Sequence, residues 1–348
     1  MFNNVYKNRK VLITGHTGFK GSWLAAWLIQ LGAEVYGYSI DIPSQPSHFE
    51  KLGLDKQMIS TFGDVRDINA LKAFTDKHKP EIVFHLAAQP IVRRAFANPL
   101  ETIQTNVIGV SNILEIARNV DYIESVVIIT SDKCYENVEW TFGYREVDQL
   151  GGEDPYSASK GAAEIIASTY MRSYFKDNRV FVATVRAGNV IGGGDWAKDR
   201  LIPDAVRAWS INEPLVIRNP SATRPWQHVL EPLSGYLLVG SELIRKNVLC
   251  KNQSFNFGPD SNVNKTVEQV LSEMSKSWQN VKWEVVPDKN NHKEAGLLKL
   301  CCDKAHHLIN WYPTLSFEET IEFTMSWYRN FYGNNSNFNV SEYTNHQI

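Results

Sequence analysis

Two residues near the middle of the chain have the types and spacing that suit acid-base chemistry. Tyr156 and Lys160 stand four positions apart, directly after Asp154-Pro155. If this segment is helical, the i, i+4 spacing places both side chains on one face. The lysine ammonium would then lower the pKa of the phenol and let the tyrosine exchange protons near neutral pH. The same spacing occurs by chance in many helices, so the pair gains meaning only beside other motifs.

A glycine-rich turn near the start of the chain has the spacing of a dinucleotide site. Residues 14–21 read Thr-Gly-His-Thr-Gly-Phe-Lys-Gly and join an apolar, β-rich run to a segment of helical period. Backbone N–H groups and the helix N-terminus of such a turn can approach a pyrophosphate because glycine carries no side chain. A purely structural turn is the alternative interpretation.

Carboxylates after the next two predicted strands extend this pattern. Asp41 stands twenty residues beyond Gly21, where it can accept hydrogen bonds from an adenosine ribose and would repel a 2′-phosphate. Asp64, at the end of the following strand, could receive the adenine amino group. The pattern predicts NAD rather than NADP, with Lys160 also holding the nicotinamide ribose. Solvated turn aspartates are the alternative.

The elements that must position these groups follow the pattern of a parallel sheet. Short apolar runs alternate with segments of helical period in the first half of the chain, as in successive βαβ units. Helices are expected to begin near Phe19, Ile68, Pro99 and Pro155. The alternation predicts an α/β fold, a Rossmann-type doubly wound parallel sheet. Six strands are expected, at residues 11–14, 34–40, 58–62, 81–86, 125–131 and 179–186.

The second half of the chain has a different residue pattern. After Arg186 the regular alternation gives way to glycines, prolines and tryptophans, with helices expected near residues 233–246 and 266–278. We therefore expect an NAD-binding domain with the catalytic residues over 1–186. Residues 187–348 should mostly form a smaller, mixed α/β substrate-binding region. The last dozen residues, rich in Asn and Ser, predict a mobile tail.

Composition and charge exclude several classes of function. Lys and Arg total 36 against 38 Asp and Glu, so the excess positive charge of a nucleic-acid or anionic-membrane binder is missing. No apolar run approaches the roughly 20 residues that span a bilayer. The four cysteines include no CxxC pair and no histidine stands at metal-ligand spacing, so neither disulfides nor a metal are expected. These features predict a protein of the reducing cytoplasm.

Taken in order along nearly the whole chain, the motifs resemble those of the extended short-chain dehydrogenase/reductase family. Within that family, Ser131 to Tyr135 resembles the segment where NAD-dependent nucleotide-sugar 4,6-dehydratases carry their elimination residues. The common pattern there is Thr-Asp-Glu; here Lys133 replaces the glutamate, as in members that act on CDP-glucose and in some related sugar dehydratases. Gln89-Pro90 and residues 192–196 support the same choice of nucleotide. The family resemblance rests on residues 14–21, 63–64, 85–89, 106, 131–132, 156–160 and 186–190.

The resemblance implies a set of cofactor residues. It assigns NAD binding to Gly15, Thr17, Gly18, Phe19, Lys20, Gly21, Asp41, Asp64, Val65, Leu86, Ala87, Ala88, Gln89, Asn106, Tyr156 and Lys160.

The resemblance also implies a reaction in three linked steps. Tyr156 takes the proton of the sugar 4-hydroxyl, which Ser131 aligns, while carbon 4 gives its hydride to NAD. Lys133 then removes the carbon 5 proton, and a protonated Asp132 donates to the leaving 6-hydroxyl. The hydride finally returns to carbon 6. A lysine of ordinary pKa, about 10.4, is mostly protonated, so a desolvated pocket must lower that pKa. The alternative to a catalytic role is that Lys133 forms a salt bridge with Asp132 or is a cation on a surface loop.

Substrate contacts are expected at the carboxyl edge of the sheet, where ligands of doubly wound folds bind. Arg224 suits a pyrophosphate because its planar fork meets two phosphate oxygens, although a surface arginine would look the same. Arg93 and Arg94 could face substrate, but ion pairing on a helix surface explains them equally well. The resemblance assigns substrate binding to Gln89, Asn189, Arg200, Leu201, Arg224, Trp226, His228, His292 and Glu294.

Three other functions stay open: a sugar-nucleotide 4-epimerase, a dehydratase acting on UDP-, dTDP- or GDP-sugars, and a non-catalytic NAD-binding sensor or scaffold. Asp132 and Lys133 favour elimination over epimerisation, and a pure binding protein would not need Tyr156. The resemblance further implies a homodimer through the helices that begin near Pro99 and Pro155. It also implies that the 4-keto-6-deoxy product of the enzyme is a precursor of the 3,6-dideoxysugars in bacterial lipopolysaccharide O-antigen.

Overall fold

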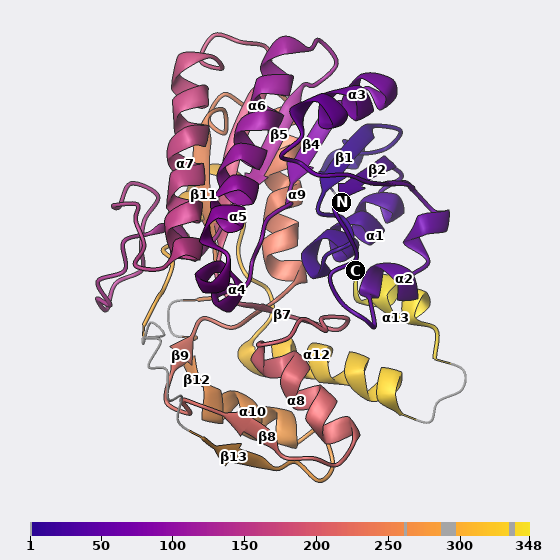
Figure 1. The fold of residues 1–348 in the computed structure, drawn as a ribbon, viewed down its shortest axis with the longest axis vertical. Coiled ribbons are helices and arrows are strands. Elements are labelled where there is room, and N and C mark those ends of the chain that lie inside the picture. Colours follow the sequence, from indigo (N-terminus) through magenta and orange to yellow (C-terminus); the bar gives the residue numbers. More distant parts are fainter. Residues whose placement is uncertain (1, 261–262, 287–296, 334–337) are drawn as a thin grey trace.

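A computed structural model describes residues 2–260, 263–286, 297–333 and 338–348. Within these ranges seven parallel strands form one sheet, which confirms the predicted fold class (Figure 1). The sheet contains the six expected strands and one more from the second half of the chain. Its order is β11 (Gln253–Phe257), β6 (Phe181–Ala187), β5 (Ser125–Ile129), β4 (Ile82–His85), β1 (Lys10–Thr14), β2 (Glu34–Ser39) and β3 (Ile59–Phe62).

Helices cover both faces of the sheet because successive strand residues point to opposite sides. Val11 and Ile13 pack with one layer, formed by α1 (Phe19–Gln30) and α9 (Leu230–Ile244). Leu12 lies between them in sequence and packs with the other layer. That second layer consists of α3 (Ile68–His78), α6 (Gly109–Asn119) and α7 (Pro155–Ser173).

The helix expected from Pro99 is longer than one regular α-helix. It runs through α5 (Pro99–Ile103), a π-helical turn at Gln104–Ile108 and α6 without leaving helical geometry. Short elements complete this half of the molecule: 3-10 helices at Phe2–Asn4, Leu54–Lys56 and Asp132–Cys134, with α2 (His48–Lys51) and α4 (Val92–Ala97).

The rest of the second half forms a lobe below the sheet in Figure 1. The division at residue 186 stays a proposal, since α9 and β11 come from beyond it yet belong to the sheet and its cover. Helix α11 (Asp303–Ile309) packs on β11 and α9 beside the sheet. The lobe and its borders contain β7 (Val190–Ile191), α8 (Leu201–Ser210), β8 (Leu215–Ile217), β9 (Thr223–Arg224), β10 (Gln227–His228), β12 (Lys265–Thr266), α10 (Val267–Ser275), β13 (Trp283–Val285) and α12 (Phe317–Tyr332).

The C-terminal segment differs from its prediction. Instead of a mobile tail, α13 (Val340–Gln347) packs beside α1, with Asn339 capping its first turn. Thr344 is fully buried and accepts a hydrogen bond of 3.1 Å from the indole of Trp327. The prediction was wrong because it weighed only polar composition, whereas a single buried face is enough to hold a short helix.

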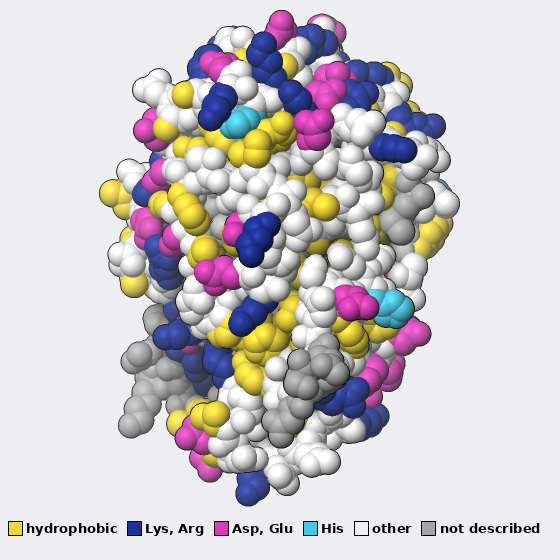
Figure 2. Space-filling view, turned by 90° about the vertical axis from the view of Figure 1, so that its right-hand side faces the viewer, with side chains coloured by type: hydrophobic (Ala, Val, Ile, Leu, Met, Phe, Trp, Pro, Cys, Tyr) yellow, Lys and Arg dark blue, Asp and Glu magenta, His cyan; other side chains and the backbone are white. Residues whose placement is uncertain are grey.

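Surface charge matches the balanced composition. Over the described residues on the face drawn in Figure 2, positive and negative side chains are interspersed among hydrophobic ones. In the described part of the chain, no helix has the length and apolar character needed to cross a membrane.

Candidate active site

A cavity of about 1040 Å³ lies between the carboxyl edge of the sheet and the lobe. Its wall includes the segments that follow β1 to β6, so both halves of the chain contribute to it. The volume is at the upper end of the range for small-molecule sites, about 300–1,000 Å³. The predicted residues that line it are Gly15, Thr17, Gly18, Phe19, Lys20, Gly21, Asp41, Asp64, Val65, Leu86, Ala87, Ala88, Gln89, Ser131, Lys133, Tyr156, Lys160, Asn189, Arg200, Leu201, Arg224 and Trp226.

The glycine turn has the geometry of a pyrophosphate cradle. Gly15 adopts a φ of +76°, and a Cβ there would lie 2.8 Å from the backbone nitrogen of Ala87. A Cβ on Gly21 would lie 2.1 Å from the carbonyl oxygen of Gly15. Both positions therefore require glycine, and the turn brings the N-terminus of α1 to the cavity. This arrangement fits an anionic dinucleotide backbone.

The two predicted adenosine carboxylates line the same cavity. The Thr17 hydroxyl donates a 2.6 Å hydrogen bond to the carbonyl of Asp41, which ties the turn to the end of β2. Asp41 itself is exposed. Arg66 hydrogen-bonds the carboxylate of Asp64 and lowers its pKa, so that group is ionised at neutral pH.

Asn106 supports the cavity from behind and does not line it. Its carbonyl oxygen accepts from the Gln89 backbone at 2.8 Å, and its amide donates to the Ser159 hydroxyl at 2.8 Å. In this structure the side chain of Asn106 therefore holds Gln89 in position, and its contact with cofactor stays a prediction.

The Tyr156–Lys160 pair lies on the first turns of α7, as predicted. Proline at the first helical position and Asp154, which accepts from the Tyr156 and Ser157 backbone, begin the helix here. Both side chains are buried and line the cavity. Burial lowers the pKa of Lys160 to about 8.

The expected lowering of the Tyr156 pKa is wrong in this structure. Burial raises that pKa to about 12, and the hydrogen bond between Tyr156 and Ser131 offsets only part of the rise. Lys160 instead directs its ammonium at the Ile129 carbonyl, 3.4 Å away. Desolvation of the phenolate therefore outweighs the positive charge of Arg200, which acts to lower this pKa.

A buried ion pair behind Lys160 was not predicted. Arg186 Nη2 lies 2.7 Å from Glu164 Oε2, with side chains only 3% and 2% exposed. The hydroxyls of Thr130 and Thr184 also donate to Glu164. Glu164 follows Lys160 by four positions, so extending the helical periodicity would have placed it on the same face.

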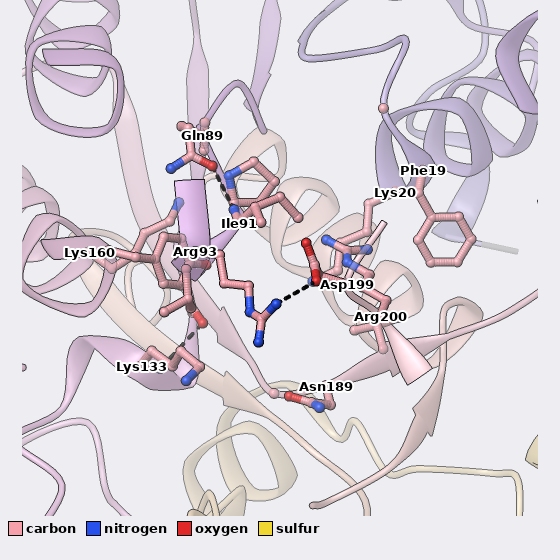
Figure 3. Close-up of a pocket in the computed structure, with 18 of the residues that line it drawn as sticks. Phe19, Lys20, Gln89, Ile91, Arg93, Lys133, Lys160, Asn189, Asp199 and Arg200 are labelled. Atoms are coloured by element: carbon pink, nitrogen blue, oxygen red, sulfur yellow. Dashed lines mark hydrogen bonds and ion pairs between the residues drawn. The ribbon is translucent and has the colours of Figure 1, made fainter. Parts of the chain in front are cut away.

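Ser131, Asp132 and Lys133 follow the end of β5 in a short 3-10 turn. The Ser131 hydroxyl donates to Asp132 Oδ1 at 2.8 Å. Burial raises the pKa of Asp132, which favours its protonated form, and its carboxyl lies just behind the cavity wall. Lys133 is partly buried and reaches the cavity itself (Figure 3).

Lys20 brings a further cation into the cavity from the first turn of α1. Its Nζ lies 3.5 Å from the Tyr236 hydroxyl. Burial, and next the charge of Arg200, lower the pKa of Lys20 to about 7. Arg200 in turn is held by Asp195, with 2.9 Å between Nη1 and Oδ2.

His228 was predicted to contact substrate, and the structure places it elsewhere. The residue is fully buried, lies outside the cavity wall, and packs its ring 6.0 Å from that of Trp23. Because β10 turns this side chain into the core, the structure adds no support for the substrate contact, which stays a prediction. His292 and Glu294 lie outside the described residues. Among the described residues, no three His, Cys, Asp or Glu side chains form a cluster that could hold a metal.

Known proteins resemble this chain in sequence over most of its length. The profile of the GDP-mannose 4,6-dehydratase family matches residues 12–324. A CDP-glucose 4,6-dehydratase of Salmonella typhimurium is 47% identical over 332 residues, covering 94% of this chain and 92% of that protein. A dTDP-glucose 4,6-dehydratase of Haemophilus influenzae is 25% identical and covers 91% of this chain and 97% of its own length.

Solved structures share the fold. A dTDP-glucose 4,6-dehydratase of Streptomyces venezuelae, solved with NAD bound, gives a TM-score of 0.79 at 22% identity, covering 92% of this chain and 96% of that one. A UDP-glucose 4-epimerase of Stenotrophomonas maltophila gives 0.81 at 18% identity, covering 93% and 99%. Dehydratases and epimerases therefore share this fold, and the fold alone does not separate the two reactions.

Proposed function

Because the chain belongs to the GDP-mannose 4,6-dehydratase family, we propose that it is an NAD-dependent hydro-lyase that converts CDP-D-glucose to CDP-4-dehydro-6-deoxy-D-glucose and water. One observation carries the proposal. A single cavity joins a dinucleotide turn to Tyr156 and Lys160 and also to the Ser131–Lys133 segment. The choice of the cytidine nucleotide rests on the relative that is 47% identical.

The first residues to act are on α7 and at the end of β5. Tyr156 accepts the proton of the sugar 4-hydroxyl once the positive charge of bound NAD has lowered the pKa of its phenol, and Ser131 orients the same oxygen by hydrogen bonding. Lys160 adds positive charge beside the phenol and holds the nicotinamide ribose. Bound NAD would supply the acceptor for the hydride of carbon 4 and the donor of that hydride to carbon 6.

Elimination needs a base and an acid of matched protonation. Lys133 removes the proton from carbon 5, which the 4-ketone has made acidic, and returns a proton there after the hydride reaches carbon 6. Asp132 donates its proton to the 6-hydroxyl as the C–O bond breaks, so water leaves. The raised pKa of Asp132 supports this role, because a carboxyl that stays protonated can serve as the acid.

The remaining cavity residues are proposed to bind the two ligands. The turn at residues 15–21, with the segments after β2, β3 and β4, would hold NAD. Asn189, Arg200, Leu201, Arg224 and Trp226 would contact the nucleotide sugar from the lobe side, with Gln89 opposite. Residues 1–186 would thus bind mainly cofactor and residues 187–348 mainly substrate.

We also infer a homodimer through α5, α6 and α7, which lie together in Figure 1. Apolar side chains are exposed along these helices and the π-helical turn between α5 and α6: Leu100 (66%), Ile103 (45%), Ile108 (44%) and Ile165 (52%). Burying them against a second copy would remove apolar area from water. Leu100→Glu combined with Ile165→Glu should give a monomer by light scattering; an unchanged mass would contradict this interface.

The proposal extends to cellular setting. Four free cysteines fit the reducing cytoplasm. The product would feed the synthesis of dideoxysugars for O-antigen.

The test is turnover of defined sugar nucleotides. Purified protein is incubated with NAD and, separately, CDP-, UDP-, dTDP- and GDP-sugars. The 4-keto-6-deoxy product is followed by its alkaline absorbance and by the mass loss of one water. Turnover of CDP-glucose alone supports the proposal. Interconversion without mass change would indicate an epimerase, and silence on all four would reject the dehydratase assignment.

A further inference from the structure

Three charged side chains from both halves of the chain meet at the cavity. Arg93 lies on α4, Asp199 directly precedes the N-cap of α8, and Arg218 follows β8. Oδ1 of Asp199 lies 3.2 Å from Arg93 Nη1 and 3.4 Å from Arg218 Nη2. All three residues line the cavity, and Figure 3 shows Arg93 extending across it toward Asp199. One carboxylate oxygen thus faces two guanidinium groups.

The cluster lies at the open part of the cavity. The side chains of Arg93, Asp199 and Arg218 are 42%, 39% and 40% exposed. Ion pairs this exposed are individually weak and are screened by salt. Arginine forks, in contrast, bind phosphate oxygens through paired, charge-assisted hydrogen bonds. A phosphate-bearing ligand can therefore replace Asp199 as the partner of the two arginines.

The backbone holds the Asp199 carboxylate in place. Its φ is +63°, in the left-handed region that Asp and Asn adopt more readily than most residues. The next residue, Arg200, caps α8 and is anchored to the buried Asp195. The aspartate is thus presented by a constrained turn, and asparagine can occupy the same turn without added strain.

We propose that Asp199 is an internal competitor for the anionic part of the substrate, its carboxylate and a nucleoside diphosphate alternating on the Arg93–Arg218 pair. The identity of the ligand as a nucleoside diphosphate rests on the proposed function. The competition makes occupancy of the pair selective, because a ligand must bring more negative charge than one carboxylate to displace Asp199. Asp199 therefore weakens binding of the substrate anion, which is the opposite of what a purely structural bridge would do.

Equilibrium binding of CDP, which requires no turnover, tests the sign of this effect. Isothermal titration calorimetry at low ionic strength compares the parent protein with Asp199→Asn, Arg93→Gln and Arg218→Gln. Asp199→Asn should bind CDP about threefold to tenfold more tightly, the range expected from two weak ion pairs. Each arginine variant should bind more weakly. The gain from Asp199→Asn should shrink when Arg93→Gln is already present, and also as salt is raised.

Glu322→Gln is the matched control. It removes one negative charge from another exposed pair in the lobe, 2.7 Å between Arg329 Nη2 and Glu322 Oε1, that does not line the cavity. Equal tightening in this variant would reduce the effect to net charge and overturn the proposal. Unchanged or weaker CDP binding by a folded Asp199→Asn protein would overturn it as well. A failed dehydratase assay beside tighter CDP binding would reject the reaction and leave the competition standing.

Discussion

Replacing Glu164 by glutamine tests whether the buried pair behind Lys160 supports this part of the site. The change keeps the shape of the side chain but leaves the Arg186 guanidinium, 3% exposed, without its carboxylate. Removing one partner of a buried ion pair costs about 3–5 kcal/mol because the other charge stays desolvated. For a chain of 348 residues, that loss corresponds to a fall in Tm of about 4–7 °C.

The pH dependence gives the prediction a sign. Burial alone would raise the pKa of Glu164, but the Arg186 charge and three hydrogen bonds hold it below the ordinary value. A lowered folded-state pKa stabilises the protein above the unfolded pKa, about 4.3, and this contribution is lost as pH falls through the folded pKa. The Tm difference between parent and Glu164→Gln should therefore be full at neutral pH and decrease in acid.

Differential scanning calorimetry at several pH values measures both effects. Glu322→Gln, which breaks the exposed Arg329 pair, should lower Tm by no more than about 1 °C. A Glu164→Gln variant with a Tm equally close to that of the parent would refute the reasoning. It would mean that water or local rearrangement neutralises Arg186.

Three further changes test the catalytic assignment. Lys133→Met should reduce formation of the 4-keto-6-deoxy product by about 100- to 10,000-fold while hydride transfer from carbon 4, seen as reduced-cofactor absorbance, persists; loss of both steps would contradict a role limited to carbon 5. Burial raises the pKa of Tyr156 to about 12, so its phenol is protonated at neutral pH, and adding NAD should lower that pKa. The shift is measured by phenolate absorbance as pH is raised, after subtraction of the signal of the Tyr156→Phe variant. Equal Tyr156 pKa values without and with NAD would contradict the prediction. Gly15→Ala should destabilise the protein by about 1–3 kcal/mol and abolish NAD binding in calorimetry, because its Cβ meets Ala87 at 2.8 Å. Gly53→Ala is the control, since its φ is also positive, +61°, but no atom lies within 4 Å of its added Cβ; it should retain NAD binding.

Much of the fold was predictable because its signals are local. Alternation of short apolar runs with helical periods located six strands of the sheet and the helices that begin at Phe19, Ile68, Pro99 and Pro155. Strand β11 (Gln253–Phe257) was missed because it lies far from its neighbour β6 in sequence, beyond the region of regular alternation. Its place in the sheet depends on a long-range pairing that no local pattern encodes.

In the candidate site, too, local features were predictable from the sequence and long-range contacts were not. Spacing alone located the glycine turn and the Tyr156–Lys160 pair, since each lies within a few residues of one element. Spacing could not reveal that Asn106 holds Gln89, or that His228 points into the core. Both outcomes depend on which segments pack against these side chains.

By itself, the sequence determined the α/β class, the dinucleotide turn and the chemical types of the catalytic groups, because these follow from periodicity, backbone freedom and side-chain identity. Only the tertiary structure decided their electrostatics. It buried Tyr156 enough to raise its pKa, paired Arg186 with Glu164, and brought Arg93 and Arg218 to Asp199. The physical reason is that desolvation and charge pairing depend on distances between residues remote in the chain, which are defined only once the sheet and the lobe pack together.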